Sequence, residues 1–357
     1  DKFDPNIFNN IIDNNIKPGT SFSRSNIEGS KKAIEFILGE KGYAFPTILV
    51  NVALQDNKGL VDIDFRVDPK KKSFVRRINI KGNTKTNDEV YRRELRQFES
   101  STYSESKIQR SKIRLQRLKF VNQVDVNKTI IDENNGYIDI DFLLDETQSG
   151  EFKIGAGYSD SSGAIFNVKV QQDNFLGKGN NVALELEKSS YKKLLRYRNT
   201  NPYFTEDGIS KSTSIVLSET DVSETSTAAY ISDTFAYGVD YNVPISEDRS
   251  YGYGAELILT EYTTTIGSPT NVTNFLNEHG DSHFGIMFKA NIVEDTRDRT
   301  VYATQGKRQS ITSNLFIKPD LDYSYTSIKF SGEYNTPYRL SFLDMFDWDT
   351  VFQIKPQ

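Results

Sequence analysis

Few residue clusters in this chain could perform chemistry. Asp139 and Asp141 are two positions apart and alternate with apolar residues, so both carboxylates would lie on one face of a strand, where a cation could bind. Because this alternation is typical of a strand with one solvated face, we interpret the pair as solvent-facing. The two histidines, His279 and His283, lie in a polar segment that indicates a loop more than a metal site.

A short glycine motif, Gly177-Lys178-Gly179, contains part of a phosphate-binding loop but lacks the further glycine and the Ser/Thr, so it predicts a tight turn. The sequence has no cysteine, which excludes disulfides and thiolate metal sites. A net charge of -5 argues against a general nucleic-acid binder. We therefore expect no enzymatic activity, no cofactor, no metal and no nucleic-acid partner.

Most of these residues belong to segments that read as alternating strands, from Gly150 to about Tyr338. Apolar residues take every second position there, and charges such as Lys169 and Glu185 take the others. One continuous apolar face and one polar face suit a sheet between lipid and water, so we expect an antiparallel transmembrane β-barrel. The clearest segments are residues 152–158, 166–170, 182–186, 235–243, 251–259, 284–292 and 311–317.

The composition agrees with this interpretation. Mean hydropathy is -0.56, and no run of about 18 apolar residues could form a transmembrane helix. A barrel can be this hydrophilic because only every second strand residue meets lipid. The 23 Phe and 19 Tyr against one Trp fit interfacial aromatic girdles, although a soluble β-sandwich can also be rich in aromatic residues.

The first 147 residues have a different pattern, that of two small α/β domains. Residues 73–147 predict the order β-α-α-β-β, in which Asn87 caps the first helix and Ser104 starts the second. The predicted elements are a strand over 74–80, helices over 88–97 and 104–118, and strands over 121–131 and 137–144. Residues 1–72 repeat this order without its first strand, with helices over 3–12 and 23–38 and strands that end near 54 and 67.

Several motifs in both regions resemble the BamA family of outer-membrane protein assembly factors, which have tandem POTRA domains before a barrel. The matching stretches are residues 74–83, 91–97, 118–124, 171–179, 200–204 and 295–306. The resemblance implies a POTRA domain without its first strand over 1–72, the last POTRA domain over 73–147, and the N-terminal part of the barrel over 148–357. It also implies that roughly ten of the sixteen family strands are present, and that both chain ends are cuts in a longer protein.

Hairpin parity supports the resemblance independently. If the chain enters the sheet from the periplasm at Gly150, successive connections must alternate between the near and the far side. The near-side connections are then 173–179, 201–208, 244–249, 295–306 and 340–349, and the far-side ones are 160–163, 189–191, 220–227, 267–282 and 319–322. Every family-like turn falls on the near, periplasmic side.

The resemblance carries three sets of expected site residues. The first barrel strand would form a lateral gate with Phe152, Ile154, Gly155, Ala156, Gly157 and Tyr158; its glycines could weaken the strand, or could only permit curvature. Periplasmic turn motifs would comprise Asn174, Leu176, Gly177, Gly179, Asn201, Pro202, Tyr203, Phe204, Asp295, Arg297 and Asp298. An accessory-partner surface would comprise Arg92, Arg93, Glu94, Arg96 and Glu99.

The resemblance implies a protein of the bacterial outer membrane with POTRA domains in the periplasm. Its expected partners are unfolded outer-membrane protein clients, accessory outer-membrane lipoproteins and outer-membrane lipid. The expected function is insertion and folding of β-barrel proteins. The alternatives are a related POTRA-barrel transporter, of the two-partner secretion or translocation and assembly module kind, and a passive porin with periplasmic binding domains.

Overall fold

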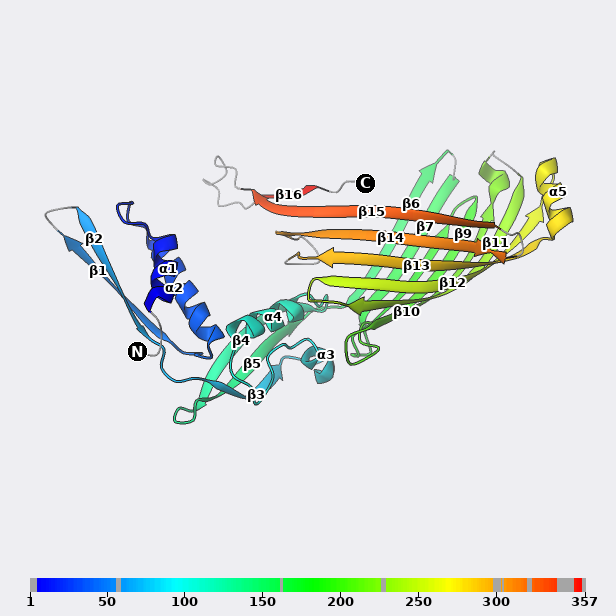
Figure 1. Cartoon of the computed structure of the whole chain (residues 1–357). Helices are drawn as coiled ribbons and strands as arrows, with labels where there is room; N and C mark the ends of the chain where they lie inside the picture. The colour runs from blue at the N-terminus through cyan, green and yellow to red at the C-terminus, as the bar shows by residue number, and fades with distance from the viewer. Residues whose placement is uncertain are drawn as a thin grey trace. The chain divides into compact units, whose positions relative to one another are not determined.

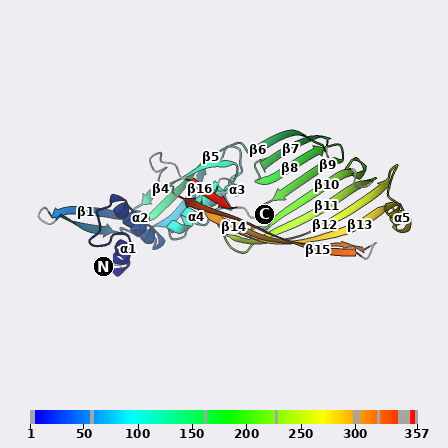
Figure 2. The ribbon, with the colours of Figure 1, turned by 90° about the horizontal axis from the view of Figure 1, so that it is seen from above.

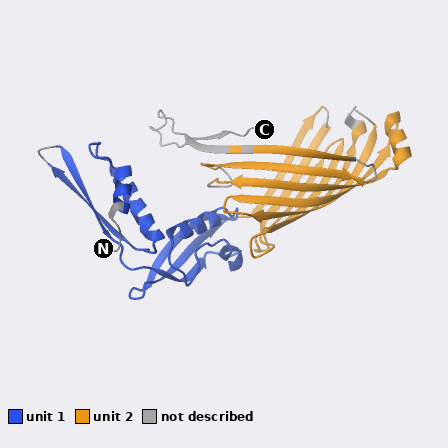
Figure 3. Ribbon diagram, in the orientation of Figure 1, with its two compact units in different colours: residues 1–147 blue, residues 148–357 orange. Residues whose placement is uncertain are grey.

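The chain forms two compact units, residues 1–147 and 148–357 (Figure 3). They are seen in a computed structural model, which describes residues 5–55, 59–160, 163–225, 229–297, 303, 305–319, 323–338 and 350–354. Each unit is considered by itself below.

The second repeat of the first unit has the expected β-α-α-β-β order (Figure 1). Its sheet has the order β3-β5-β4, with β3 parallel and β4 antiparallel to the central β5. Both helices cover this sheet, and the core between the layers includes Val75, Leu115 and Phe142, each fully buried. The elements are β3 (Phe74–Lys81), α3 (Asp88–Arg92), α4 (Glu105–Gln116), β4 (Val121–Asp132) and β5 (Tyr137–Glu146).

Helix α3 is shorter than predicted, because it ends at Arg92 rather than near residue 97. The N–H of Arg96 donates to the buried Oγ of Ser111 on α4 at 2.8 Å, which diverts it from helical hydrogen bonding. Asn87 occupies the N-cap position of α3 as predicted, but its side chain makes no capping hydrogen bond. By contrast, Ser104 caps α4 as predicted, since its Oγ accepts from the N–H of Lys107.

The prediction that Asp139 and Asp141 share one solvent-facing side of a strand is only partly right. Both lie on one face of β5, but Asp139 is only 9% exposed and accepts a hydrogen bond from Arg76 Nε at 2.9 Å. Asp141 accepts from Asn79 at 2.7 Å and from Lys81 at 2.6 Å. The parallel strand β3 thus supplies a positive charge for each carboxylate, and these are structural ion pairs.

Glu146 fastens the loop before α3 to the end of β5. Its carboxylate accepts hydrogen bonds from the N–H groups of Lys85 at 2.8 Å and Thr86 at 3.1 Å, and from the Tyr91 hydroxyl at 2.7 Å. Burial opposes ionisation of this carboxyl, but the hydrogen bonds from Thr86, Tyr91 and Lys85 outweigh it and lower the pKa of Glu146 to about 2.

The first repeat begins with helices, with no strand before them among its described residues. It comprises α1 (Pro5–Asn15), α2 (Arg24–Glu40), β1 (Thr47–Gln55) and β2 (Leu60–Asp68). The antiparallel β1-β2 pair packs against the helices through Ile34, Leu38 and Ile48. Its last helix also contacts the second repeat: the Glu40 carboxylate accepts hydrogen bonds from Ser106 Oγ at 2.8 Å and Ser104 Oγ at 3.0 Å at the start of α4.

The second unit is one antiparallel sheet of eleven described strands, each paired with its neighbour in the sequence. Figure 2 shows strands β6 to β13 side by side in a curved sheet. The predicted antiparallel sheet is therefore confirmed, and β6 and β16 form its two edges among the described strands. The strands are β6 (Gly150–Ser159), β7 (Gly163–Phe175), β8 (Asn180–Lys188), β9 (Lys192–Asn201), β10 (Ser210–Asp221), β11 (Tyr230–Pro244), β12 (Arg249–Thr264), β13 (Ser282–Asp295), β14 (Gly306–Lys318), β15 (Tyr323–Tyr338) and β16 (Thr350–Ile354).

The register places apolar side chains in continuous rows on one face. One such row runs through the register partners Leu186 and Leu195, then Leu217, Phe235 and Leu259. The other face carries ion pairs such as Glu185 with Arg196 at 3.1 Å. This separation confirms the predicted apolar and polar faces, because Leu186, Leu217, Phe235 and Leu259 of the row are 41–48% exposed where lipid would cover them.

The long far-side connection contains a helix, α5 (Thr270–His279), which was not predicted. His283 is not in a loop; it belongs to β13, is 1% exposed and packs against Tyr262 and Phe275, with ring centroids 5.7 and 5.5 Å away. The part of the chain that the structure describes holds no group of three or more His, Cys, Asp or Glu residues able to bind a metal ion. No helix within the described ranges is long and apolar enough to cross a membrane.

Candidate functional site

The first barrel strand, β6, lies at the edge of the sheet. One side pairs with β7 from Gly150 to Ser159, and the other pairs with no described strand. Phe152, Ile154 and Tyr158 are 64%, 69% and 77% exposed, more than most apolar residues of the interior strands. An edge strand offers unpaired N–H and C=O groups to any extended chain that approaches it.

The two glycines of β6 differ in their surroundings. A Cβ atom on Gly155 would lie 2.3 Å from Oδ1 of Asn167, its register partner on β7. A Cβ atom on Gly157 would meet nothing within 4 Å. Gly155 therefore makes room for the Asn167 amide, whereas Gly157 leaves the polar face of the strand bare, and Ala156 between them points to the apolar face opposite Phe166.

Alanine substitutions should separate these two roles. Gly155→Ala should cost about 1 kcal/mol of folding free energy, because the exposed Asn167 side chain must turn away from the new methyl group. Gly157→Ala should change the free energy by less than about 0.5 kcal/mol. Urea titrations of the full-length protein in lipid vesicles would measure both, and equal losses would contradict the difference in packing.

The first near-side connection is a tight turn built by Asn174. The buried Asn174 Oδ1 accepts the N–H of Gly179 at 2.7 Å. Leu176, Gly177 and Gly179 all have positive φ, of 54°, 72° and 72°. Backbone with positive φ favours glycine, which explains Gly177 and Gly179. The Gly177-Lys178-Gly179 motif is therefore part of a tight turn and not of a phosphate site.

The second near-side turn carries an aromatic cluster. Asn201 Oδ1 accepts the N–H of Tyr203 at 3.0 Å, which closes the turn around Pro202. The ring of Phe204 meets Tyr241 edge-on at 6.1 Å, and Lys211 Nζ lies 4.8 Å from the Phe204 ring centroid. Aromatic rings beside a cation suit the boundary between lipid and the aqueous periplasm.

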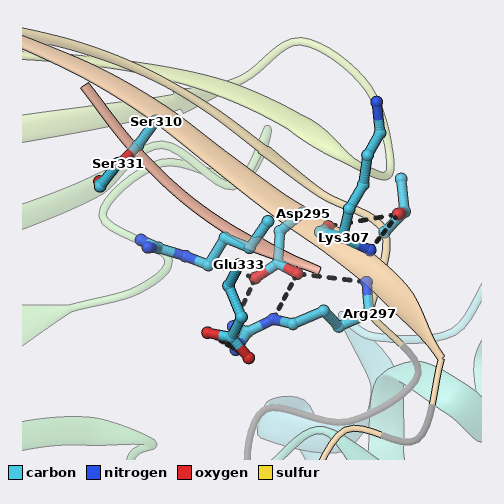
Figure 4. A network of polar contacts seen from close by, with 8 residues as sticks. Asp295, Arg297, Lys307, Ser310, Ser331 and Glu333 are labelled. Atoms are coloured by element: carbon cyan, nitrogen blue, oxygen red, sulfur yellow. Dashed lines mark hydrogen bonds and ion pairs between the residues drawn. The ribbon is translucent and has the colours of Figure 1, made fainter. Parts of the chain in front are cut away.

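The fourth near-side turn is tied to a strand that follows it. Arg297 donates two hydrogen bonds to Asp295, both 2.8 Å long, and also contacts the Glu333 carboxylate on β15 at 3.2 Å (Figure 4). The Arg297 side chain is 10% exposed, so this pairing is largely shielded from water. Asp298 lies outside the described residues. Glu333 was missed, since it comes 36 residues after Arg297.

The accessory-partner residues do not form one exposed patch. Arg92 and Glu99 are exposed and lie together: Arg92 Nη1 is 3.8 Å from Glu99 Oε1, and both side chains contact the backbone of Ile78. Phe98 beside them is 64% exposed. Arg93 and Arg96 are half-buried.

Glu94 must be removed from this surface. It is 6% exposed, and its carboxylate pairs with Arg114 Nη2 of α4 at 2.6 Å. A buried residue in an internal ion pair cannot contact a partner, so the fully exposed part of the predicted surface is Arg92 and Glu99, and the exposed Phe98, which was not predicted, adjoins them.

Family models match both units. Residues 174–347 match the Omp85 superfamily domain, and residues 1–70 and 73–147 match the surface antigen variable number repeat, or POTRA. The chain is 28% identical over 312 residues to the outer membrane protein assembly factor BamA of Neisseria meningitidis, an alignment that covers 85% of this chain and 39% of that protein. The chain therefore spans less than half the length of this relative.

Solved structures show the same fold. BamA from Haemophilus ducreyi lacking POTRA domains 1–3 superposes with a TM-score of 0.73 at 24% identity, over 94% of this chain and 65% of that one. CdiB from Acinetobacter baumannii gives a TM-score of 0.50 at 15% identity, over 99% of this chain and 65% of that one. The chain thus carries two POTRA repeats and an Omp85 superfamily domain, and it is similar to BamA over most of its length.

Proposed function

We propose that this protein inserts and folds β-barrel proteins in the bacterial outer membrane, with its POTRA repeats in the periplasm. The observation that carries the proposal is the exposed edge of β6, directly after the second repeat in the sequence. A client strand that adds to this edge gains backbone hydrogen bonds in the membrane, where an unpaired peptide group is costly. β6 would thus act as a gate and as a template.

The repeats would supply client chains to this edge. Strand β4 forms an edge of the second repeat's sheet, and Ile130 and Ile131 on it are each 47% exposed. Such an edge can hold an extended polypeptide by β-augmentation before it reaches the membrane. The process needs no enzymatic step, because the free energy would come from folding of the client.

The exposed group Arg92, Phe98 and Glu99 supports docking of an accessory outer-membrane lipoprotein. An exposed aromatic side chain beside charges of both signs is typical of a binding surface. In this proposal the partner contributes complementary charges at the rim and an apolar contact for Phe98.

A reversible lock on β6 tests the gate. We expect that a disulfide between a cysteine in β6 and one in the closing strand of the full-length barrel blocks assembly of outer-membrane proteins, and that reduction restores it. Residues 1–357 contain no cysteine, so the cysteine introduced in β6 would be the only one in this part of the protein. Assembly of a client barrel in vesicles, with and without reductant, is the measurement.

The matched control is a disulfide between Lys153→Cys and Lys169→Cys, which are register partners on β6 and β7. This pair ties β6 to its permanent neighbour and leaves the free edge open, so assembly should continue. If the protein with the β6 disulfide assembles client barrels as fast as the reduced protein, the gate proposal is wrong. Client binding would then be assigned to the edges of the POTRA sheets.

A related POTRA-barrel transporter is the second candidate, because POTRA repeats and an Omp85 domain do not by themselves distinguish the two functions. The relatives named outer membrane protein assembly factor favour the assembly role. The same experiment separates the two: a transporter would release one dedicated substrate into the medium, whereas an assembly factor leaves many folded barrels in the membrane.

A further inference from the structure

Glycines on the polar face of the sheet make room for side chains from neighbouring strands. A Cβ atom on Gly252 of β12 would lie 2.3 Å from Oδ1 of its register partner Asn291 on β13. A Cβ atom on Gly254 would lie 2.2 Å from Oδ1 of its register partner Asp240 on β11. At both positions the space of the missing side chain is therefore filled by a residue of the next strand.

At Gly285 of β13 the space is filled by an aromatic ring. On one side, the register partner of Gly285 is Ile258 of β12, an apolar residue on the polar face. On the other side, Cζ of Phe316 on β14 lies 2.7 Å from the position of a Cβ atom on Gly285. A ring in this position covers the backbone that a glycine leaves exposed, and aromatic residues stabilise edge glycines in the same way. Three neighbouring strands thus carry the order Ile, Gly, Phe.

Gly157 of β6 repeats the first two members of this order. Its register partner on β7 is Ile165, again an apolar residue on the polar face. A Cβ atom on Gly157 would meet nothing within 4 Å, whereas the space at Gly155 is occupied by Asn167. No described strand pairs with the other side of β6. The side chain that fills the space at Gly157 must therefore come from a strand that adds to the free edge.

An aromatic side chain suits this space better than a polar one. Ile165 offers it an apolar surface, and aromatic side chains pair favourably with β-branched ones across strands. Neighbouring strands are about 4.8 Å apart, so a ring that crosses Gly157 reaches the Ile165 side chain on the strand beyond. Phe316 at Gly285 shows that the polar face of this sheet accommodates such a ring.

We propose that Gly157 and Ile165 form a subsite for an aromatic side chain of the client strand that pairs with β6. The inference rests on the proposed assembly function and adds a recognition rule to it. Apolar residues on the lipid-facing side are common to all barrel strands, so they cannot distinguish one strand from another. An aromatic residue on the opposite side, which faces the lumen, is a more selective requirement.

Cysteine crosslinking would locate the client residue beside the subsite. The Gly157→Cys variant of the full-length protein is mixed with a small client barrel that carries single cysteines along the lumen-facing positions of its edge strands. We expect the strongest disulfide to form at or beside an aromatic position of the client. A strongest disulfide far from any lumen-facing aromatic residue would overturn the proposal.

A reciprocal exchange would test the packing itself. Replacing the mapped client aromatic residue by glycine should slow its assembly by the unmodified protein about fivefold, the effect of one aromatic cross-strand pair. The Gly157→Phe variant should slow the unmodified client, because two rings cannot share the space. The same variant should assemble the glycine client faster than the unmodified client.

The matched control is Ser327→Phe, which adds the same ring to an exposed position on the polar face of β15. This variant should still assemble the unmodified client faster than the glycine client. Equal rates for the two clients with the unmodified protein would overturn the subsite, and this comparison decides even if the Gly157→Phe variant does not fold. A Gly157→Phe variant that slows both clients by one factor would also overturn it, since that marks a general effect on the barrel.

The disulfide lock on β6 separates this inference from the proposed function. If the lock blocks assembly and the exchange of rings has no effect, the gate is supported and only the subsite is wrong. If the lock leaves assembly unchanged, the gate itself is wrong and the subsite falls with it.

Discussion

Replacing Glu94 by alanine should destabilise the first unit by about 3–5 kcal/mol, because it leaves the Arg114 guanidinium largely buried without its carboxylate. The Glu94 and Arg114 side chains are 8% and 21% exposed, so water cannot fully replace the lost partner. This loss is a large part of the roughly 5–15 kcal/mol that stabilises a typical domain. Denaturant unfolding of residues 1–147, followed by circular dichroism, would measure it.

Glu99→Ala is the matched comparison. Glu99 is exposed and close to Arg92, but its carboxylate also accepts the N–H of Ile78 at 2.8 Å, so its removal should cost about 1–2 kcal/mol of stability, less than the loss of Glu94. In our proposal this variant instead weakens binding of the accessory lipoprotein. The assignment of the two glutamates would have to be reversed if the Glu94 variant kept its stability and lost the partner.

Leu257→Arg should cost about 2–4 kcal/mol of folding free energy in vesicles if the site lies near the middle of the bilayer. Leu257 is on the apolar face of β12, with Tyr237 and Ile286 as its register partners. Folding titrations of the full-length protein into lipid vesicles would measure the cost.

Ser327→Arg provides the control on the polar face. Ser327 on β15 faces Asn314 of β14, and its side chain is exposed. An arginine there meets water in the lumen and should change the folding free energy by less than about 0.5 kcal/mol. Equal losses in the two variants would contradict the assignment of faces.

Local patterns were sufficient to predict most of the sheet. In a strand with one apolar and one polar face, apolar and polar residues alternate along the sequence. Turns with positive φ favour glycine, as at Gly177 and Gly179. The alternation of connections then follows from strand order alone. Strand alternation, turn glycines and the sides of the connections all depend on residues close together in the sequence, so they can be predicted from the sequence alone.

The errors come from contacts between distant residues. The early end of α3 depends on Ser111, and the burial of Glu94 depends on Arg114, both on another helix. The partner of Arg297, Glu333, and the neighbour of Gly155, Asn167, likewise come from other strands. Helix α5 did have a local signal, since Val272, Phe275 and Leu276 have helical spacing, but the surrounding polar residues favoured a loop.

The pairing of each barrel strand with its sequence neighbour also sets an order of folding. Every described pair in this sheet closes a short connection, which costs little chain entropy. Any strand that pairs with the free side of β6 from beyond β16 must instead close a loop on the order of 200 residues, at an extra entropic cost of about 3 kcal/mol. Closure at β6 would therefore come last as the protein itself folds, and the same edge would be the first to reopen.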